Sequence, residues 1–303
     1  MASTTVLTVQ PNALAIKTPL GTILHTGDWK IDPDPQIGSA TDVKGLTALG
    51  DEGVLAMVCD STNVCEEGES GSEESVKQGL IDLIAEQKQA VAVTTFASNV
   101  ARVNSIVEAA ESAGRAVCLV GRSMHRITDA AKSVGILPPH MEFIDESEAS
   151  QIPAEHILYL CTGSQGEARA ALTRISRRDH RNVSLHEGDT VIFSSRQIPG
   201  NEKGIFALQN ALAEQGVRVI TPRMVPYPIH VSGHPCRDEL RRMYGWVRPQ
   251  VSIPVHGERR HIMEHANFAK SLQVPHAVTP QNGSLIRIAP GKAQIVDVVP
   301  AGR

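Results

Sequence analysis

The chain has 303 residues, of which 41% are hydrophobic and 20% charged, and its formal net charge is −4. These values are typical of a globular protein with a sizeable core, and they exclude a polycation that holds nucleic acid through its overall charge. Aromatic residues make up only 3% of the chain, which argues against a surface built for base stacking. The five cysteines include no Cys-x-x-Cys pair, so we expect reduced thiols rather than disulfides or a thiolate metal site.

The sequence predicts a cytoplasmic protein that does not cross a membrane. The first residues carry neither the basic region nor the long apolar run of a secretory signal. Elsewhere, no run of about 18 apolar residues occurs, and a membrane-spanning helix needs one of about that length.

Apolar segments alternate with helical periodicities along most of the chain. Two strands are expected at 13–17 and 22–24, followed by a loop rich in Asp, Pro and Gly at 32–38. Further strands are expected at 54–59, 90–93, 116–120, 156–160, 190–193, 217–220 and 251–255, each followed or preceded by a helical pattern. Two short antiparallel strands, 285–288 and 294–298, come last. This alternation predicts βαβ units and a largely parallel sheet.

Polar and small residues stand just beyond the carboxyl ends of several predicted strands, where open α/β sheets bind ligands. Asp28, Asp60 and Ser194 occupy such places. The segment 163–166 is expected to open a helix, and its backbone N–H groups could hold a phosphate, although small residues also serve a tight turn. Arg122 repeats this placement with a guanidinium. A run of arginines between 174 and 181 is either a phosphate-contacting surface or a solvated helix face.

Three histidines lie at strand and helix ends within a short stretch. His230 and His234 flank a Ser-Gly pair, which favours a loop entering a helix, and His256 follows the strand at 251–255. One histidine alone is most often a hydrogen-bonded structural residue. Three in this arrangement, with Asp28 placed similarly after an earlier strand, favour part of a metallohydrolase site.

Eight motifs in order give these residues a family context. The series resembles bacterial ribonuclease J, of the β-CASP branch of the metallo-β-lactamase superfamily. The motifs are HTGD (25–28), DSTN (60–63), TFASN (95–99), GRSM (121–124), CTGSQGE (161–167), IPGNE (198–202), HVSGH (230–234) and PVHGE (254–258).

The resemblance implies an α/β fold, in which a partial metallo-β-lactamase αββα sandwich carries an inserted β-CASP domain with a parallel sheet flanked by helices. Residues 1–62 would be a remnant of the metallo-β-lactamase domain, 63–222 the β-CASP domain, and 223–303 the C-terminal part of the first domain. It further implies a metal-dependent 5′–3′ exoribonuclease and endoribonuclease that acts in RNA processing and decay, rRNA processing included. RNA is the implied partner, together with a second copy in a dimer and other RNA-decay proteins.

The resemblance also implies roles for individual residues. Asp28 and His256 would bind metal, in a family that uses two divalent ions, Zn²⁺ or Mn²⁺. Asp60, His230 and His234 would be catalytic, with His234 assisting proton transfer. Contacts to RNA phosphates would come from Arg122, Ser123, Gly163, Ser164, Gln165, Gly166, Ser232 and Gly233.

The chain departs from the family pattern in its metal ligands. It contains no His-x-His-x-Asp-His signature, and no histidine precedes Pro11. We therefore expect weak or absent metal binding, and a chain that lacks the N-terminal metal-binding half and the C-terminal domain. Three alternatives follow: a truncated ribonuclease J, a non-catalytic RNA-binding relative, or a protein whose site is completed by a separate chain.

Overall fold

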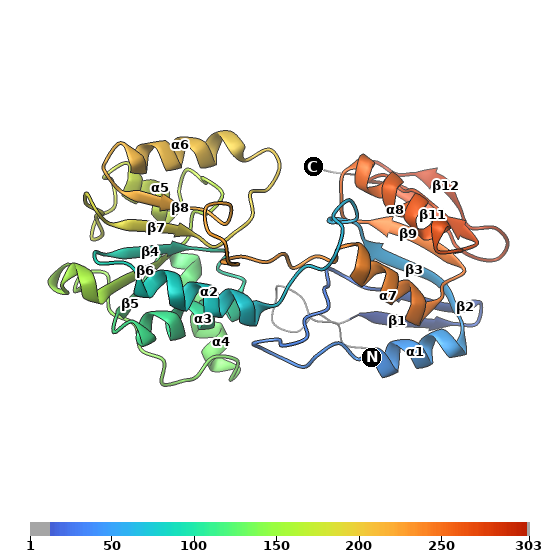
Figure 1. Ribbon diagram of the computed structural model, residues 1–303. Helices are drawn as coiled ribbons and strands as arrows, with labels where there is room; N and C mark the ends of the chain where they lie inside the picture. Colours follow the sequence, from blue (N-terminus) through green and yellow to red (C-terminus); the bar gives the residue numbers. More distant parts are fainter. Residues whose placement is uncertain (1–12, 302–303) are drawn as a thin grey trace. The chain divides into compact units, whose positions relative to one another are not determined.

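A computed structural model describes residues 13–301 and divides the chain into two compact units (Figure 1). Unit 1 combines Met1–Gly71 with Ser232–Arg303, and unit 2 is Ser72–Val231. Unit 2 is thus an insertion in the sequence of unit 1. It begins and ends somewhat later than the predicted domain boundaries after 62 and after 222. The predicted boundaries separate the domains of the family, whereas the two units are defined by the contacts within each of them. The domain boundaries therefore stay a prediction.

Unit 1 is built on a five-stranded sheet in the order β1-β2-β3-β9-β10, in which only the β1–β2 pair is antiparallel. Its strands are β1 (Leu14–Thr18), β2 (Gly21–His25), β3 (Val54–Asp60), β9 (Val251–Val255) and β10 (His276–Ala277). Its helices are α1 (Val43–Glu52), α7 (Arg237–Val247) and α8 (Arg259–Ser271). A separate antiparallel pair consists of β11 (Ser284–Arg287) and β12 (Gln294–Val298).

The two faces of this sheet pack against different elements. Side chains alternate along each strand, so neighbouring residues contribute to different hydrophobic clusters. Met57 and Cys59 of β3 share a core with Leu46 of α1 and Leu240 of α7. On the other face, Ala56 belongs to a smaller cluster that is completed by the segment around β11. Unit 1 is therefore one helix-covered sheet with a short second strand layer.

Unit 2 has a wholly parallel sheet in the order β5-β6-β4-β7-β8. Its strands are β4 (Val91–Thr94), β5 (Ala116–Val120), β6 (Ile157–Cys161), β7 (Thr190–Phe193) and β8 (Arg218–Ile220). Its helices are α2 (Glu73–Ala85), α3 (Val100–Ser112), α4 (Arg122–Ser133), α5 (Ala171–Ser176) and α6 (Glu202–Ala213), with 3₁₀ turns at Ala149–Gln151 and Ala154–His156.

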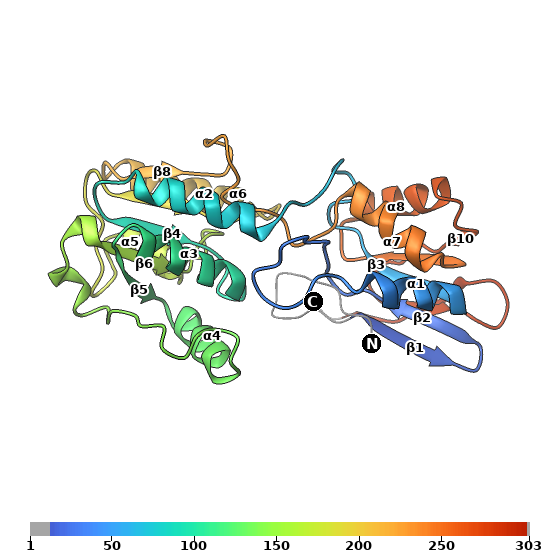
Figure 2. The ribbon, with the colours of Figure 1, turned by 60° about the horizontal axis from the view of Figure 1, so that its bottom comes forward.

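Helices cover both faces of this second sheet, as a parallel sheet requires. Leu172 of α5 and Leu208 of α6 join Tyr159 and Phe193 in one core. Figures 1 and 2 show α2 and α3 side by side on the opposite face. The expected fold class, an α/β protein with parallel sheets flanked by helices, is confirmed.

Two elements were not predicted, and one was misplaced. Strand β10 has only two residues, and α1 contains Gly45 and Gly50, which lower helix propensity. Gly50 is needed where α1 approaches α7, since a Cβ there would meet the carbonyl oxygen of Trp246 at 2.1 Å. The helix expected to open at 163–166 in fact begins at Ala171 and ends at Ser176, so residues 177–181 of the arginine run lie outside it.

The sequence also led to expectations about membrane crossing, the cysteines and the first residues of the chain. Within residues 13–301 no helix has both the length and the apolar composition that a bilayer crossing needs. None of the five cysteines, all of which lie within the described residues, forms a disulfide. The segment before Pro11, where the family's further histidine was sought, lies outside the described residues.

Candidate metal centre

Four side chains of unit 1 converge at one edge of its sheet. Asp28 follows β2, Asp60 ends β3, His256 follows β9, and His234 lies in the loop before α7. Strands β2, β3 and β9 are parallel neighbours, so their carboxyl ends meet at the same edge. One possible ligand atom from each of the four lies within 4.8 Å of the others.

Asp60 lies at the centre of the hydrogen bonding in this group. Its side chain is fully buried, and its Oδ2 accepts a hydrogen bond from His234 Nδ1 at 2.7 Å. Its Oδ1 lies 3.5 Å from Nδ1 of His256, which is itself 2.8 Å from Oδ1 of Asp28. The rings of His234 and His256 are 5.1 Å apart between centroids. One buried carboxylate thus orients both imidazoles.

The charges of the group shift two pKa values in opposite directions. Burial works against ionisation of Asp60, but hydrogen bonds from His234 and His256 outweigh it and hold the pKa of Asp60 well below its usual range. Hydrogen bonds to Asp28 and then to Asp60 raise the pKa of His256 to about 10. Without a metal ion, the group therefore holds a protonated His256 between two carboxylates.

The backbone at His256 adopts a conformation that L-residues rarely adopt. Its φ is 55°, in the left-handed region. Its carbonyl oxygen accepts hydrogen bonds from Ser61 N–H at 3.3 Å and from Thr62 Oγ1 at 3.2 Å. These bonds hold the turn that directs His256 toward the edge of the sheet.

The loop that carries His234 is fixed by its own hydrogen bonds. Asn63 Nδ2 donates to Ser232 Oγ at 2.8 Å and to the carbonyl oxygen of His234 at 3.0 Å. Ser232 Oγ also accepts from the backbone N–H of His234. Gly233 is buried in the same loop. The contacts place Ser232 as a support of His234, while the RNA-phosphate role of Ser232 and Gly233 stays a prediction.

A second hydrogen-bonded network begins at Ser61, the residue after Asp60, and was not predicted from the sequence. The hydroxyl of Ser61 lies 2.8 Å from His265 Nδ1, and His265 Nε2 lies 2.9 Å from the hydroxyl of Tyr244. Tyr244 in turn lies 2.6 Å from Ser252 Oγ. No sequence motif surrounds His265, and only the packing of α8 against the sheet reveals its role.

The donor set fits a divalent metal ion. Two carboxylates and two imidazoles are ligand types that Zn²⁺ accepts, and a hydrolytic zinc site usually has three protein ligands and an open position. Asp28 and His256 are each about half exposed, which leaves one side of the group open to water. The hydrogen bonds around Asp60 and His234 supply the outer-shell support that metal ligands commonly have.

His230 has a different environment, in unit 2. Its Nδ1 lies 3.3 Å from Nη1 of Arg102, a guanidinium that is fully buried. Because a guanidinium can only donate, Nδ1 accepts and the proton of a neutral His230 is on Nε2. His230 and His234 were predicted to act together, yet the four-residue group includes His234 alone of the two.

The turn at 163–166 is held inside unit 2. Ser164 and Gln165 are buried, and Gln165 bridges to a neighbouring loop through the carbonyl oxygen of Arg196 and the N–H of Ile198. Gly166 has a φ of 72° and lies so close to Gly204 that a Cβ would clash. These contacts assign Gln165 and Gly166 a packing role, and phosphate binding by 163–166 stays a prediction.

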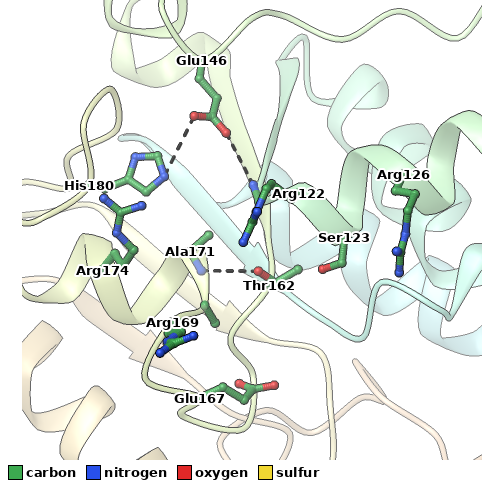
Figure 3. A pocket seen from close by; sticks show the side chains of 12 residues that line it. Arg122, Ser123, Arg126, Glu146, Thr162, Glu167, Arg169, Ala171, Arg174 and His180 are labelled. Atoms are coloured by element: carbon green, nitrogen blue, oxygen red, sulfur yellow. Dashed lines mark hydrogen bonds and ion pairs between the residues drawn. The ribbon is translucent and has the colours of Figure 1, made fainter.

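Arg122 and Ser123 are placed differently from that turn. Both are exposed at the start of α4 and line a pocket in unit 2, together with residues that follow β6 (Figure 3). Their predicted phosphate contacts are not tested by this placement.

Comparison with known proteins agrees with the geometry. The family model described as "Ribonuclease J, beta-CASP domain" matches residues 88–212, and the one described as "Zn-dependent metallo-hydrolase RNA specificity domain" matches 223–278. The second range contains His234 and His256, so the family match and the donor set both indicate a divalent metal.

Curated relatives match nearly all of the chain. Ribonuclease J of Sinorhizobium meliloti is 49% identical over 97% of the chain and 52% of the relative. The protein of the same name from Corynebacterium glutamicum is 42% identical over 95% of the chain and 40% of the relative, and that from Helicobacter pylori is 34% identical over 97% and 43%. The chain spans about half the length of the curated relatives it matches. With both domain models and these relatives in agreement, the chain belongs to the ribonuclease J family.

Proposed function

We propose that the chain functions as part of a ribonuclease J-type, metal-dependent 5′–3′ exoribonuclease and endoribonuclease in cytoplasmic RNA processing and decay. The observation that carries the proposal is the convergence of Asp28, Asp60, His234 and His256 within 4.8 Å. The RNA-specificity domain match over 223–278 supports RNA as the substrate class.

The four residues have two different proposed roles, metal binding and proton transfer, according to their positions. Asp28 and His256 are the exposed pair and would hold a divalent ion, whose chemistry is to make a bound water a nucleophile at neutral pH. Asp60 holds Nδ1 of His234, which leaves Nε2 as the nitrogen that can exchange a proton with a phosphate or leaving oxygen. His230 would contact the scissile phosphate.

The number of donors limits the metal content that we propose. Only Asp28 and His256 of the four side chains are assigned to the ion, whereas a hydrolytic ion usually has three protein ligands. We therefore propose that the described residues hold one ion, and hold it weakly. We also propose, from the family resemblance, that the ion is Zn²⁺ or Mn²⁺ and that the protein forms a dimer and binds other RNA-decay proteins. The domain boundaries after 62 and after 222 are proposed on the same ground. The two-ion centre of the family would need ligands beyond these four side chains.

A second candidate function is RNA binding without hydrolysis. The arginine-lined pocket that contains Arg122 favours it, because guanidinium groups bind phosphate without any metal. This candidate predicts salt-sensitive RNA binding with no turnover.

Metal analysis of the purified chain, combined with an RNA cleavage assay, tests the proposal. We expect up to one bound Zn²⁺ or Mn²⁺ per chain, and metal-dependent cleavage of 5′-monophosphorylated RNA that His234→Ala abolishes. His276→Ala is the matched control, since His276 is exposed at the amino end of β10, away from the edge that holds the group. Two tightly bound ions would refute the proposed metal content. Metal-free chain without cleavage would refute the enzyme proposal.

A further inference from the structure

A carboxylate without a charged hydrogen-bond partner is buried inside unit 1. It belongs to Glu239 in the first turn of α7, and this residue has no exposed surface. The groups that donate hydrogen bonds to it are neutral, three backbone N–H groups and one hydroxyl. Burying a carboxylate costs free energy, and hydrogen bonds must offset the hydration that it loses. The position of Glu239 is therefore tightly coupled to the positions of its donors.

The four hydrogen bonds connect three separate segments of the chain. Oε1 of Glu239 accepts from the N–H of Ile31 at 2.8 Å and from the hydroxyl of Ser70 at 2.7 Å. Oε2 accepts from the N–H of Ser70 and from the N–H of Cys236, both at 2.8 Å. Ile31 lies 208 positions from Glu239 and Ser70 lies 169, so the carboxylate joins two distant segments to the start of α7.

Helix capping accounts for only one of these bonds. A Glu at the third position of a helix commonly accepts from the N–H of the N-cap residue, and Cys236 is the N-cap of α7. The bonds from Ile31 and Ser70 satisfy no group of the helix. A carboxylate that served capping alone would not need them, so they indicate a second role.

Two of the joined segments carry residues of the metal centre. Asp28 lies three residues before Ile31, and His234 lies two residues before Cys236. Ile31 and Cys236 donate to the two oxygens of the same carboxylate, so the geometry of one rigid group sets their separation. Glu239 thus sets the distance between the segment of Asp28 and the segment of His234.

The residues between Asp28 and Ile31 transmit this constraint. The side chain of Trp29 is fully buried in the core that α1 and α7 share with the sheet. Lys30 is buried too, with its Nζ 3.0 Å from Oδ2 of Asp32 and 2.9 Å from a backbone carbonyl oxygen. Because both side chains are held, a shift of Ile31 would be passed on to Asp28.

Asp28 depends on such support more than Asp60 does. Its side chain is about half exposed, and within residues 13–301 its one ion-pair or hydrogen-bond partner is His256. Asp60 is instead buried, and its Oδ1 accepts from the N–H and the hydroxyl of Thr62 at 2.9 and 2.7 Å. A metal ligand with few contacts of its own takes its position from the backbone that carries it.

We propose that Glu239 is a positioning residue of the metal centre, whose carboxylate holds the segment of Asp28 at a fixed distance from the segment of His234. Buried as it is, Glu239 would contact neither substrate nor metal and would act through the backbone N–H groups of Ile31 and Cys236. The proposal rests on the proposed function for the presence of a metal ion, whereas the positioning of Asp28 can be measured in the metal-free chain.

The variant Glu239→Gln separates the two roles of the carboxylate. An amide has one accepting oxygen and an NH₂ group that only donates. The oxygen can keep the bonds from the N–H groups of Ser70 and Cys236, and hence the helix cap, while the NH₂ donates to the Ser70 hydroxyl. The N–H of Ile31 would then face a donor and be released. Ser70→Ala is the matched control, because it removes one hydrogen bond to the same carboxylate and releases neither segment.

Co²⁺ titration of the full chain, followed by the visible absorption of the bound ion, measures the effect on the metal centre. We expect Glu239→Gln to weaken Co²⁺ binding about tenfold, the lower end of what loss of outer-shell support costs, and to shift the absorption spectrum. Ser70→Ala should leave both as they are. Urea denaturation measures the stability of the metal-free variants separately, and lower stability with unchanged affinity and spectrum would overturn the proposal.

NMR of the metal-free chain tests the positioning without a metal ion. In the original chain the amide of Ile31 should be protected from hydrogen exchange, and exchange at the rate of an exposed amide would overturn the proposal. Glu239→Gln should speed this exchange and increase the backbone mobility of Asp28 in ¹⁵N relaxation, and Ser70→Ala should do neither.

The two measurements distinguish failure of this proposal from failure of the proposed function. If no chain binds Co²⁺, the proposed metal site is contradicted and the NMR comparison decides. Mobility of Asp28 that rises in Glu239→Gln alone then supports the positioning role, and equal mobility in all three chains overturns it.

Discussion

The guanidinium of Arg102 forms a two-point ion pair with the carboxylate of Glu73 inside unit 2. Nε lies 2.9 Å from Oε2, and Nη2 lies 2.8 Å from Oε1. Arg102 is fully buried, and its remaining nitrogen donates to Ser194 Oγ at 2.7 Å and reaches His230 Nδ1. One buried cation thus connects α2, α3, the end of β7 and the histidine predicted to contact RNA.

Removing the negative partner should destabilise unit 2 strongly. Glu73→Gln would leave a buried guanidinium without its counter-charge, and we expect a loss of about 3–5 kcal/mol in the free energy of unfolding. Urea denaturation followed by far-UV circular dichroism measures it. The control is Glu52→Gln, which removes the exposed Lys17–Glu52 pair and should change stability by under about 1 kcal/mol. Equal effects of the two variants would contradict the importance of the buried pair.

Metal binding should release a proton from His256. Hydrogen bonds to Asp28 and Asp60 raise the pKa of His256 to about 10, so the metal-free residue is protonated at neutral pH, and an ion must displace that proton to use the ring. The apparent affinity for Zn²⁺ should therefore rise about tenfold per pH unit between pH 6 and 8. Titration calorimetry in buffers of different ionisation enthalpy should count about one released proton, and a count of zero would disprove the coupling.

The stability of the metal-free chain should fall between pH 6.5 and pH 4 because of His265. Burial lowers its pKa to about 4, whereas the unfolded residue binds a proton below about 6.5. The contribution is therefore fully present above pH 6.5 and is lost as the pH falls toward 4, by about 3 kcal/mol. His180, whose pKa is also lowered by burial, acts in the same direction, so the test is the difference between variants.

His265→Gln should flatten this part of the pH profile of unfolding, measured by urea denaturation at several pH values. His276→Ala, at an exposed histidine, should leave it unchanged. A slope that both variants share with the original chain would exclude His265 as its cause.

Two helical glycines should respond oppositely to alanine. Gly79 of α2 lies so close to the Pro228 carbonyl oxygen that a Cβ would stand 2.2 Å from it, and overpacking of this kind costs about 1–3 kcal/mol. Gly245 of α7 has nothing within 4 Å of the same position, so Gly245→Ala should stabilise by about 0.5–1 kcal/mol through helix propensity. Thermal unfolding compares the two, and a stabilising Gly79→Ala would contradict the close approach.

Much of the fold could be predicted because it depends on local patterns. Apolar runs of strand length and helical periodicities located nearly all strands and most helices, and the same patterns placed Asp28, Asp60 and His256 just beyond strand ends. Helix α1 was not predicted because Gly45 and Gly50 lower its helix propensity. In the folded protein, packing against α7 makes up for this low propensity.

The sequence by itself indicated the family, the order of its motifs and the candidate metal ligands Asp28 and His256, since these depend on residue type and spacing. Only the tertiary structure decided which of them meet. Asp60 and His234 are 174 positions apart, and their 2.7 Å contact exists because β3 and the loop before α7 end at the same sheet edge. His230, four residues from His234, is instead held by Arg102. Spacing along the chain cannot distinguish these two outcomes, because the direction of each side chain depends on contacts with distant elements.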